Sequence, residues 1–140
     1  MAQTAAAPSE NLFKVLKSYN VHIPMRDGVR LAAHIYRPEA EGKFPVILVR
    51  TPYGKDSKSA FAQAEYFAQH GYVYVWQDVR GRYDSEGEFS VLVNEGRDGY
   101  DTIEWLARQP WSNGSIGTFG GSYLSWDQWL AAEEKPSHLK

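Results

Sequence analysis

Gly120-Gly121-Ser122-Tyr123-Leu124 lies between a short apolar segment, Ile116–Phe119, and a stretch with helical character that runs from Tyr123 to about Glu134. The apolar segment predicts a buried strand, and Pro136 marks the end of the helix. The two glycines allow the chain to turn sharply between these elements. A serine on such a strand-to-helix turn is lifted above the edge of a sheet, where its hydroxyl can attack a substrate. Ser122 is therefore our candidate nucleophile.

The serine motif is incomplete by itself. The usual pattern is Gly-x-Ser-x-Gly, and Leu124 stands where the second glycine is expected. Gly-Gly-Ser turns without a catalytic role are common, so the motif alone leaves a structural reading open. The strand before it and the helix after it favour catalysis. A helix that begins at Tyr123 would direct its backbone N–H toward a developing oxyanion, which makes that N–H a candidate donor.

Outward from this turn, the pattern predicts an α/β fold. An Asp27-Gly28 turn joins two alternating segments into an antiparallel hairpin. The remaining segments alternate between buried strands and helices, which predicts parallel βα units with helices on both faces of the sheet. The predicted strands are 18–23, 31–36, 46–49, 72–77 and 116–119, and the predicted helices are 57–70, 98–109 and 123–134. We expect residues 1–17 to be a flexible tail and residues 18–140 to form part of one catalytic domain.

Three local features carry more specific expectations. Asp98 is placed to cap the helix that it would begin, and Asn113-Gly114 predicts a turn. The segment that contains Arg80, Arg82, Asp84 and Glu86 predicts a solvated or ion-paired loop. It lacks the Gly-Lys-Ser/Thr ending of a phosphate-binding loop.

Composition narrows the classes of function. The net charge is −2 with no basic stripe, which argues against nucleic acid as a partner. The sequence has no cysteine for disulfides or thiolate chemistry, no stretch near the roughly 18 apolar residues of a membrane helix, and no metal or cofactor fingerprint. It begins without an intact signal peptide, so a cytoplasmic location is the default and an exported one requires a processed N-terminus. Nothing in the sequence indicates an oligomeric state.

Several long stretches resemble one family of α/β-hydrolases. They are IPMRDGVRLAAHIYRP (23–38), FPVILVRTPYGK (44–55), GYVYVWQDVRGRYDSEGEF (71–89), NEGRDGYDTIEWLARQPWSNGSIGTFGGSYL (94–124) and QWLAA (128–132). The chain resembles, from about Val21 onward, the family that includes cocaine esterase, α-amino-acid ester hydrolases, glutaryl acylases and X-prolyl dipeptidyl-peptidases. The resemblance implies a serine hydrolase that acts on a small-molecule ester or amide, or on a peptide, through an acyl-enzyme.

The resemblance also assigns residues. It implies that Ser122 is the nucleophile and that the Tyr53 hydroxyl and the Tyr123 backbone N–H form the oxyanion hole. The sequence departs from the family at Ser125, where glycine is frequent. It departs again at Lys55, where the amino-acid ester hydrolases carry a carboxylate that holds the substrate's ammonium group. Such a pocket is therefore disfavoured, and Lys55 is expected to be an exposed loop residue that has no specific role or that favours an anionic acyl group.

The triad acid and base are expected beyond Lys140, because in this fold they follow the serine along the chain. His138 lies at the far end of the last helix, and a helix of about 12 residues spans about 18 Å. His22, His34 and His70 are interpreted as structural.

Five strands are visible where the family has about eight, so we expect exposed apolar surface and an unstable or inactive chain, or one piece of a longer protein. The alternatives are an X-prolyl dipeptidyl-peptidase and a non-catalytic truncated fragment.

Overall fold

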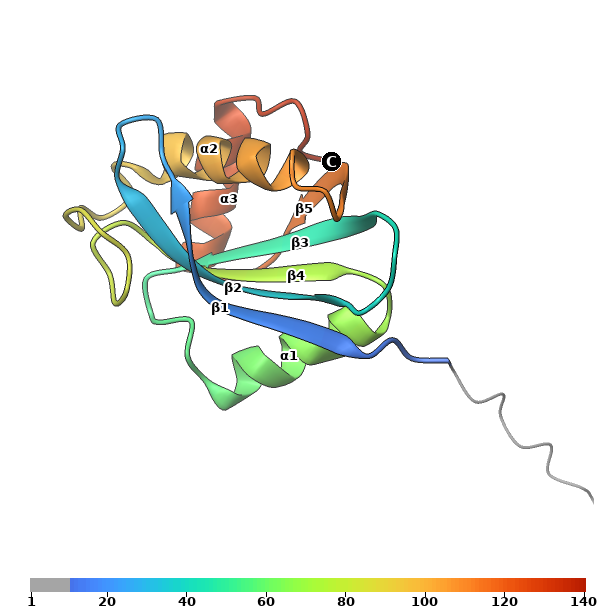
Figure 1. The fold of residues 1–140 in the computed structure, drawn as a ribbon. Helices are drawn as coiled ribbons and strands as arrows, with labels where there is room; N and C mark the ends of the chain where they lie inside the picture. Colours follow the sequence, from blue (N-terminus) through green and yellow to red (C-terminus); the bar gives the residue numbers. More distant parts are fainter. Residues whose placement is uncertain (1–10) are drawn as a thin grey trace, which may run out of the picture.

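A single mixed sheet of five strands forms the centre of residues 11–140, which are the residues that this computed structural model describes (Figure 1). Three helices complete this part of the chain. The elements are β1 (Val15–Pro24), β2 (Arg30–Pro38), β3 (Phe44–Thr51), α1 (Lys58–Gln69), β4 (Val73–Asp78), α2 (Glu95–Ala107), β5 (Ser112–Thr118) and α3 (Tyr123–Glu133).

The strand order is β1-β2-β4-β3-β5. β1 pairs with β2 and β2 with β4 in antiparallel fashion, whereas β3 is parallel to both β4 and β5. The chain thus moves one way from β3 to β4 and then back past β3 to β5. Since both connections between parallel strands are right-handed, they lie on opposite faces of the sheet. Accordingly α1 covers one face, and α2 and α3 cover the other (Figure 1).

Each face of the sheet has its own hydrophobic core. Val46 and Leu48 of β3 point into the larger core with Ile103 and Leu106 of α2. The alternate side of the sheet forms a smaller core with α1, which contains Tyr36, Val49, Ala64, Ala68 and Tyr74. Because successive side chains of a strand point to opposite faces, burial on both faces requires the continuous apolar runs seen in the sequence.

Two elements begin earlier than the sequence predicts, with consequences for the residues at their starts. β1 begins at Val15, so residues 15–17 pair with β2 and do not belong to a tail, while residues 1–10 lie outside the described part. α2 begins at Glu95 with Asn94 as its N-cap. The prediction that Asp98 caps this helix is wrong, because Asp98 lies within its first turn and its carboxylate accepts hydrogen bonds from Arg80.

The expected turn at Asn113-Gly114 is part of β5. Gly114 has a positive φ of 83°, and the pairing register between β3 and β5 shifts beside it, between Phe44 and Val46. A glycine that takes a left-handed conformation inside a strand is typical of a bulge. Gly114 therefore has the turn-like backbone conformation that the sequence predicts, but the strand continues through it.

The expected exposed apolar surface is present on α3. Trp126 is 62% exposed and Trp129 is 70% exposed. Within residues 11–140, no helix is both long and apolar enough to cross a membrane.

α2 and α3 pack so closely at Gly99 that adding one methyl group there should disturb their contact. A Cβ atom built on Gly99 would lie 2.5 Å from the Cβ of Ala131, well inside van der Waals contact. Gly99→Ala should therefore lower the free energy of unfolding by about 1–3 kcal/mol, although alanine favours helix formation. Adding Ala131→Gly should recover part of this loss in urea denaturation. Unchanged stability of Gly99→Ala would contradict the close packing.

Candidate active site

The topological switch point of the sheet lies at the carboxyl ends of the parallel strands. β3 leads into α1 on one face, whereas β4 and β5 lead into α2 and α3 on the other face. Loops that leave neighbouring strands toward opposite faces separate at that edge, and ligands of open α/β sheets bind there. Tyr53 follows β3 and Ser122 follows β5, so the fold brings these two predicted residues to the same edge.

Ser122 has the strained backbone of a sharp strand-to-helix turn. Its φ of 58° and ψ of −127° are rare for a residue with a side chain. Ser122 is exposed and occupies the N-cap position of α3, yet its side chain makes no capping hydrogen bond. A strained, exposed serine whose hydroxyl does not serve the helix has the geometry expected of a nucleophile.

Gly120 explains how the turn closes. Its φ is 138°, and a Cβ atom at this position would lie 2.5 Å from the Cβ of Leu124. Leu124, which replaces the second glycine of the usual motif, therefore packs directly over Gly120. The small residue on the strand side leaves room for the larger residue on the helix side.

Tyr53 and Tyr123 contact each other beside this turn. Their ring centroids are 6.3 Å apart at an interplanar angle of 72°, and the Tyr53 side chain remains largely exposed. The Tyr123 hydroxyl donates to Glu95 at 2.9 Å and accepts a hydrogen bond from the backbone N–H of Leu92 at 3.1 Å. Burial raises the pKa of Tyr123 to about 12, so its phenol stays protonated. The backbone N–H of Tyr123 belongs to the first turn of α3, where N–H groups have no partner within the helix.

Lys55 is completely buried, so the expectation of an exposed loop lysine is wrong. Its Nζ lies 2.9 Å from Asp78 and 2.5 Å from Asp84, and its backbone N–H donates to Asp78 as well. Burial alone would favour the neutral amine, but the hydrogen bonds to Asp84 and Asp78 outweigh it and raise the pKa of Lys55. The ammonium thereby fastens the loop of Tyr53 to the end of β4.

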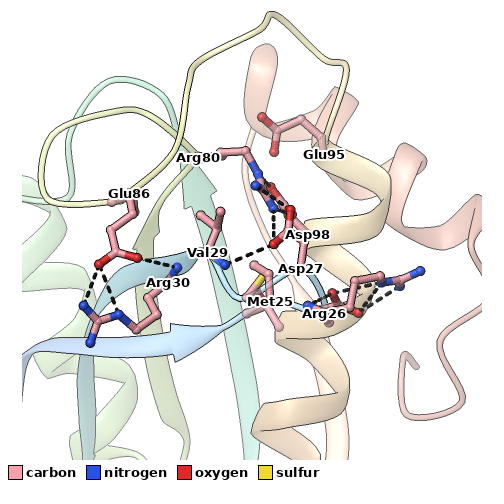
Figure 2. A network of polar contacts seen from close by, with 12 residues as sticks. Met25, Arg26, Asp27, Val29, Arg30, Arg80, Glu86, Glu95 and Asp98 are labelled. Atoms are coloured by element: carbon pink, nitrogen blue, oxygen red, sulfur yellow. Dashed lines mark hydrogen bonds and ion pairs between the residues drawn. The ribbon is translucent and has the colours of Figure 1, made fainter.

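Ion pairs also anchor the loop between β4 and α2 (Figure 2). Arg80 contacts Asp98 at 2.7 Å and Asp27 at 2.8 Å, which links the loop to α2 and to the hairpin turn. Farther along the loop, Glu86 accepts hydrogen bonds from the side chain and the backbone N–H of Arg30. Of the two predictions for this charged segment, the ion-paired one is confirmed at these residues.

The anchored loop places apolar side chains beside the two tyrosines. Phe89 and Val91 line a hollow of about 230 Å³ together with Pro52, Tyr53, Arg82 and Tyr123. Ser122 opens onto a second, larger hollow of about 620 Å³ whose other lining residues are Ser125, Trp126, Trp129 and Glu133. The candidate nucleophile and the candidate oxyanion groups therefore border surfaces on which an organic substrate can rest.

A cluster of buried charged and polar side chains lies between the sheet and the helices α2 and α3. The sequence pattern did not predict this cluster. Arg50 of β3 pairs with Glu95 at 2.8 Å and donates to Gln77 at 2.9 Å. Asp127 of α3 is 2% exposed, and its Oδ2 atom has no hydrogen-bond partner in the described part of the chain. Burial raises the pKa of Asp127 to about 8; the charge of Arg50 opposes this rise and that of Glu95 adds to it.

Two of the histidines pair with carboxylates. His34 pairs with Asp56 at 2.8 Å, and His138 pairs with Glu104 at 2.8 Å. The backbone carbonyl of His138 accepts a hydrogen bond from the backbone N–H of Ile116 in β5. Within residues 11–140, no group of three or more His, Asp or Glu side chains could hold a metal ion.

A sequence model of the X-Pro dipeptidyl-peptidase (S15) family matches residues 27–140. The chain belongs to this family. The S15 match includes every candidate residue described above and confirms the resemblance inferred from the sequence.

Among the relatives of this S15 chain is cocaine esterase from Rhodococcus sp. (strain MB1 Bresler), 46% identical over 125 residues. The alignment covers 86% of the chain and 22% of that enzyme. A CocE/NonD family hydrolase from Staphylococcus aureus superposes with a TM-score of 0.81 at 35% identity, over 90% of the chain and 26% of the hydrolase. An α-amino acid ester hydrolase gives 0.78 at 32% identity, over 99% of the chain and 26% of that enzyme.

The chain thus has the part of the α/β-hydrolase fold that contains the opening hairpin and the strand-to-helix turn of Ser122, and it spans about a quarter of the length of these relatives.

The raised pKa of Asp127 predicts a pH-dependent stability difference. Between about pH 4, the pKa of an unfolded aspartate, and about pH 8, the folded chain binds a proton that the unfolded chain has lost. This contribution lowers the free energy of unfolding as pH rises through that range. Asp127→Asn removes this titrating carboxyl. The free energy of unfolding of the variant should therefore match that of the parent near pH 4 and exceed it by about 3–5 kcal/mol at pH 8.

Urea denaturation at several pH values measures this difference. Glu133→Gln, on the exposed part of the same helix, is the matched control. Its free energy of unfolding should differ from that of the parent by the same amount at every pH. A stability gain of Asp127→Asn that does not vary with pH would contradict the interpretation.

Proposed function

We propose that this chain forms the nucleophile-bearing part of a serine hydrolase that acts on an ester or amide through an acyl-enzyme. The observation that carries the proposal is the strained, exposed backbone of Ser122 between β5 and α3. The position of Tyr53 at the same sheet edge and membership of the S15 family support it.

In the proposed reaction, Ser122 Oγ attacks the substrate carbonyl and its proton passes to a general base. The Tyr53 hydroxyl and the Tyr123 backbone N–H donate hydrogen bonds to the oxyanion of the tetrahedral intermediate. The base returns the proton to the leaving alcohol or amine, which leaves Ser122 acylated. Water then attacks the acyl-enzyme by the same route and releases the acid.

The general base and its orienting carboxylate are proposed to come from outside these 140 residues. His34 pairs with Asp56 and His138 with Glu104, and neither pairs with Ser122, which supports this assignment. The relatives also extend well beyond the matched segment. On this proposal, Ser122 by itself is a weak nucleophile in the 140-residue chain.

An X-Pro dipeptidyl-peptidase is the second candidate, because the matching family carries that description. Such a peptidase must bind the free amine of its substrate, which calls for an acidic group near the site. Lys55 lies where the amino-acid ester hydrolases hold a carboxylate, so we favour a general ester or amide substrate. Comparing an aryl ester with a chromogenic X-Pro dipeptide amide separates the two activities.

Labelling with a fluorophosphonate tests the nucleophile and the missing base together. The 140-residue chain should gain mass slowly, and about 50 mM imidazole, which can reach the exposed Ser122 as an external base, should accelerate labelling by about tenfold or more. Ser122→Ala should abolish the gain under both conditions, as read by intact-protein mass spectrometry. Rapid labelling without imidazole would place a base inside this chain, and no labelling with imidazole would favour the non-catalytic alternative.

Removing the Tyr53 hydroxyl tests its proposed role. In the presence of imidazole, Tyr53→Phe should lower the rate of Ser122 labelling by about 10²-fold, the usual effect of losing one oxyanion-hole donor. Tyr66→Phe, which removes an exposed tyrosine hydroxyl on α1, is the matched control and should label at the parent rate. Equal rates for Tyr53→Phe and the parent would remove Tyr53 from the mechanism.

A further inference from the structure

Three buried charged side chains lie together between β3, α2 and α3: Arg50 of β3, Glu95 of α2 (Figure 2) and Asp127 of α3. A Cβ atom built on Gly99 would lie 2.5 Å from the Cβ of Ala131 and 3.3 Å from Arg50 Nη1. Glu95 lies one turn before Gly99, on the same face of α2. Asp127 likewise lies one turn before Ala131 on α3. Both carboxyl groups therefore border the Arg50 guanidinium.

The charges in this cluster balance only while Asp127 is protonated. From the elements packed against α3, the charged groups that act on Asp127 are Arg50 and Glu95. These two residues pair at 2.8 Å and are neutral as a pair, whereas Asp98, the other buried aspartate of this region, pairs with Arg80. An ionised Asp127 would add one uncompensated negative charge to a buried place. Burial raises the pKa of Asp127 to about 8, so its carboxyl group is mostly protonated at neutral pH.

The contacts of the cluster leave hydrogen-bonding capacity unused. Arg50 Nη2 and Glu95 Oε2 are close, but their contact lacks hydrogen-bond geometry, and both atoms are buried without a hydrogen-bond partner among residues 11–140. Asp127 Oδ2 is a third such atom. A buried donor without a hydrogen bond costs free energy, so Arg50 Nη2 gains a partner by turning toward an ionised Asp127. The guanidinium therefore has two carboxyl groups to choose between, and one proton decides the choice.

Glu95 connects this cluster to the turn of Ser122. Its Oε1 atom accepts a hydrogen bond from the Tyr123 hydroxyl at 2.9 Å, and the same hydroxyl accepts one from the backbone N–H of Leu92 at 3.1 Å. Tyr123 follows Ser122 directly and is the first residue of α3. A displacement of Glu95 therefore acts on the residue next to the candidate nucleophile.

We propose that Asp127 is a positioning residue for Ser122, and that it holds the turn in its strained conformation only in its protonated form. While Asp127 is neutral, Arg50 stays paired with Glu95. Glu95 then anchors the Tyr123 hydroxyl. When Asp127 loses its proton, Arg50 turns toward it, Glu95 shifts, and the first turn of α3 loosens. The effect on reactivity rests on the proposed hydrolase function, whereas the coupling between Asp127 and Tyr123 does not.

The ¹³Cζ signal of Tyr123, followed by NMR in the 140-residue chain between pH 6 and pH 9, tests this coupling. Burial raises the pKa of Tyr123 to about 12, so its own hydroxyl does not titrate in this range. In the parent the signal should shift with a midpoint near pH 8, because its hydrogen bond to Glu95 changes. Asp127→Asn, which stays neutral at every pH, should remove the transition. Glu133→Gln, on the exposed part of α3, is the matched control and should titrate like the parent.

Fluorophosphonate labelling with imidazole tests whether the coupling reaches Ser122. The ratio of the rates of Asp127→Asn and the parent at each pH cancels the effect of pH on imidazole. The rates should be equal near pH 6, and the parent should be about fivefold slower at pH 9, as expected when one hydrogen bond that holds the turn is lost. Circular dichroism shows at which pH values each variant is folded, and rates are compared there.

A Tyr123→Phe background separates this role from a purely structural one. There Asp127→Asn should no longer change the labelling rate with pH, although it should still change the free energy of unfolding with pH. If Tyr123→Phe is unfolded, the tyrosine signal of Asp127→Asn against that of the parent decides the test.

A Tyr123 signal that moves equally in the parent and in Asp127→Asn would overturn the proposal, and so would a rate ratio that does not vary with pH. Failure of the hydrolase proposal has a different signature. In that case Ser122 would not be labelled at any pH, while the transition of the Tyr123 signal would remain.

Discussion

The buried ammonium of Lys55 is the contact on which the candidate site most depends. It joins three segments that are distant in sequence: its own loop after β3, the end of β4 at Asp78, and the following loop at Asp84. Tyr53 precedes Lys55 by two residues. Removing the charge would leave Asp78 buried without its counter-ion, a change that commonly costs about 3–5 kcal/mol. One lysine therefore holds the loop of the candidate oxyanion donor against the end of β4.

The strain at Ser122 is maintained by packing on both sides of the turn. A residue held in a rarely populated backbone region costs about 1–3 kcal/mol, so its surroundings must compensate. Leu124 closes over Gly120 above the strand, and the close contact between Gly99 and Ala131 holds α3 against α2. The hydrogen bond from Tyr123 to Glu95 ties the first residue of α3 to the first residue of α2. These contacts leave the serine little freedom to relax into an ordinary conformation.

The features of the fold that the sequence predicts correctly depend on local sequence patterns. The Asp27-Gly28 turn, the apolar run of β3 and the Gly-Gly-Ser turn each depend on residues close together in the chain, and all three appear where they were expected. Charged side chains were harder to interpret, because their partners are remote. Lys55 is 23 residues from Asp78, and Asp98 pairs with Arg80, 18 residues away. Nothing in the residues next to Lys55 indicates that it is buried, and nothing next to Asp98 shows that its carboxylate serves an arginine and not a helix end.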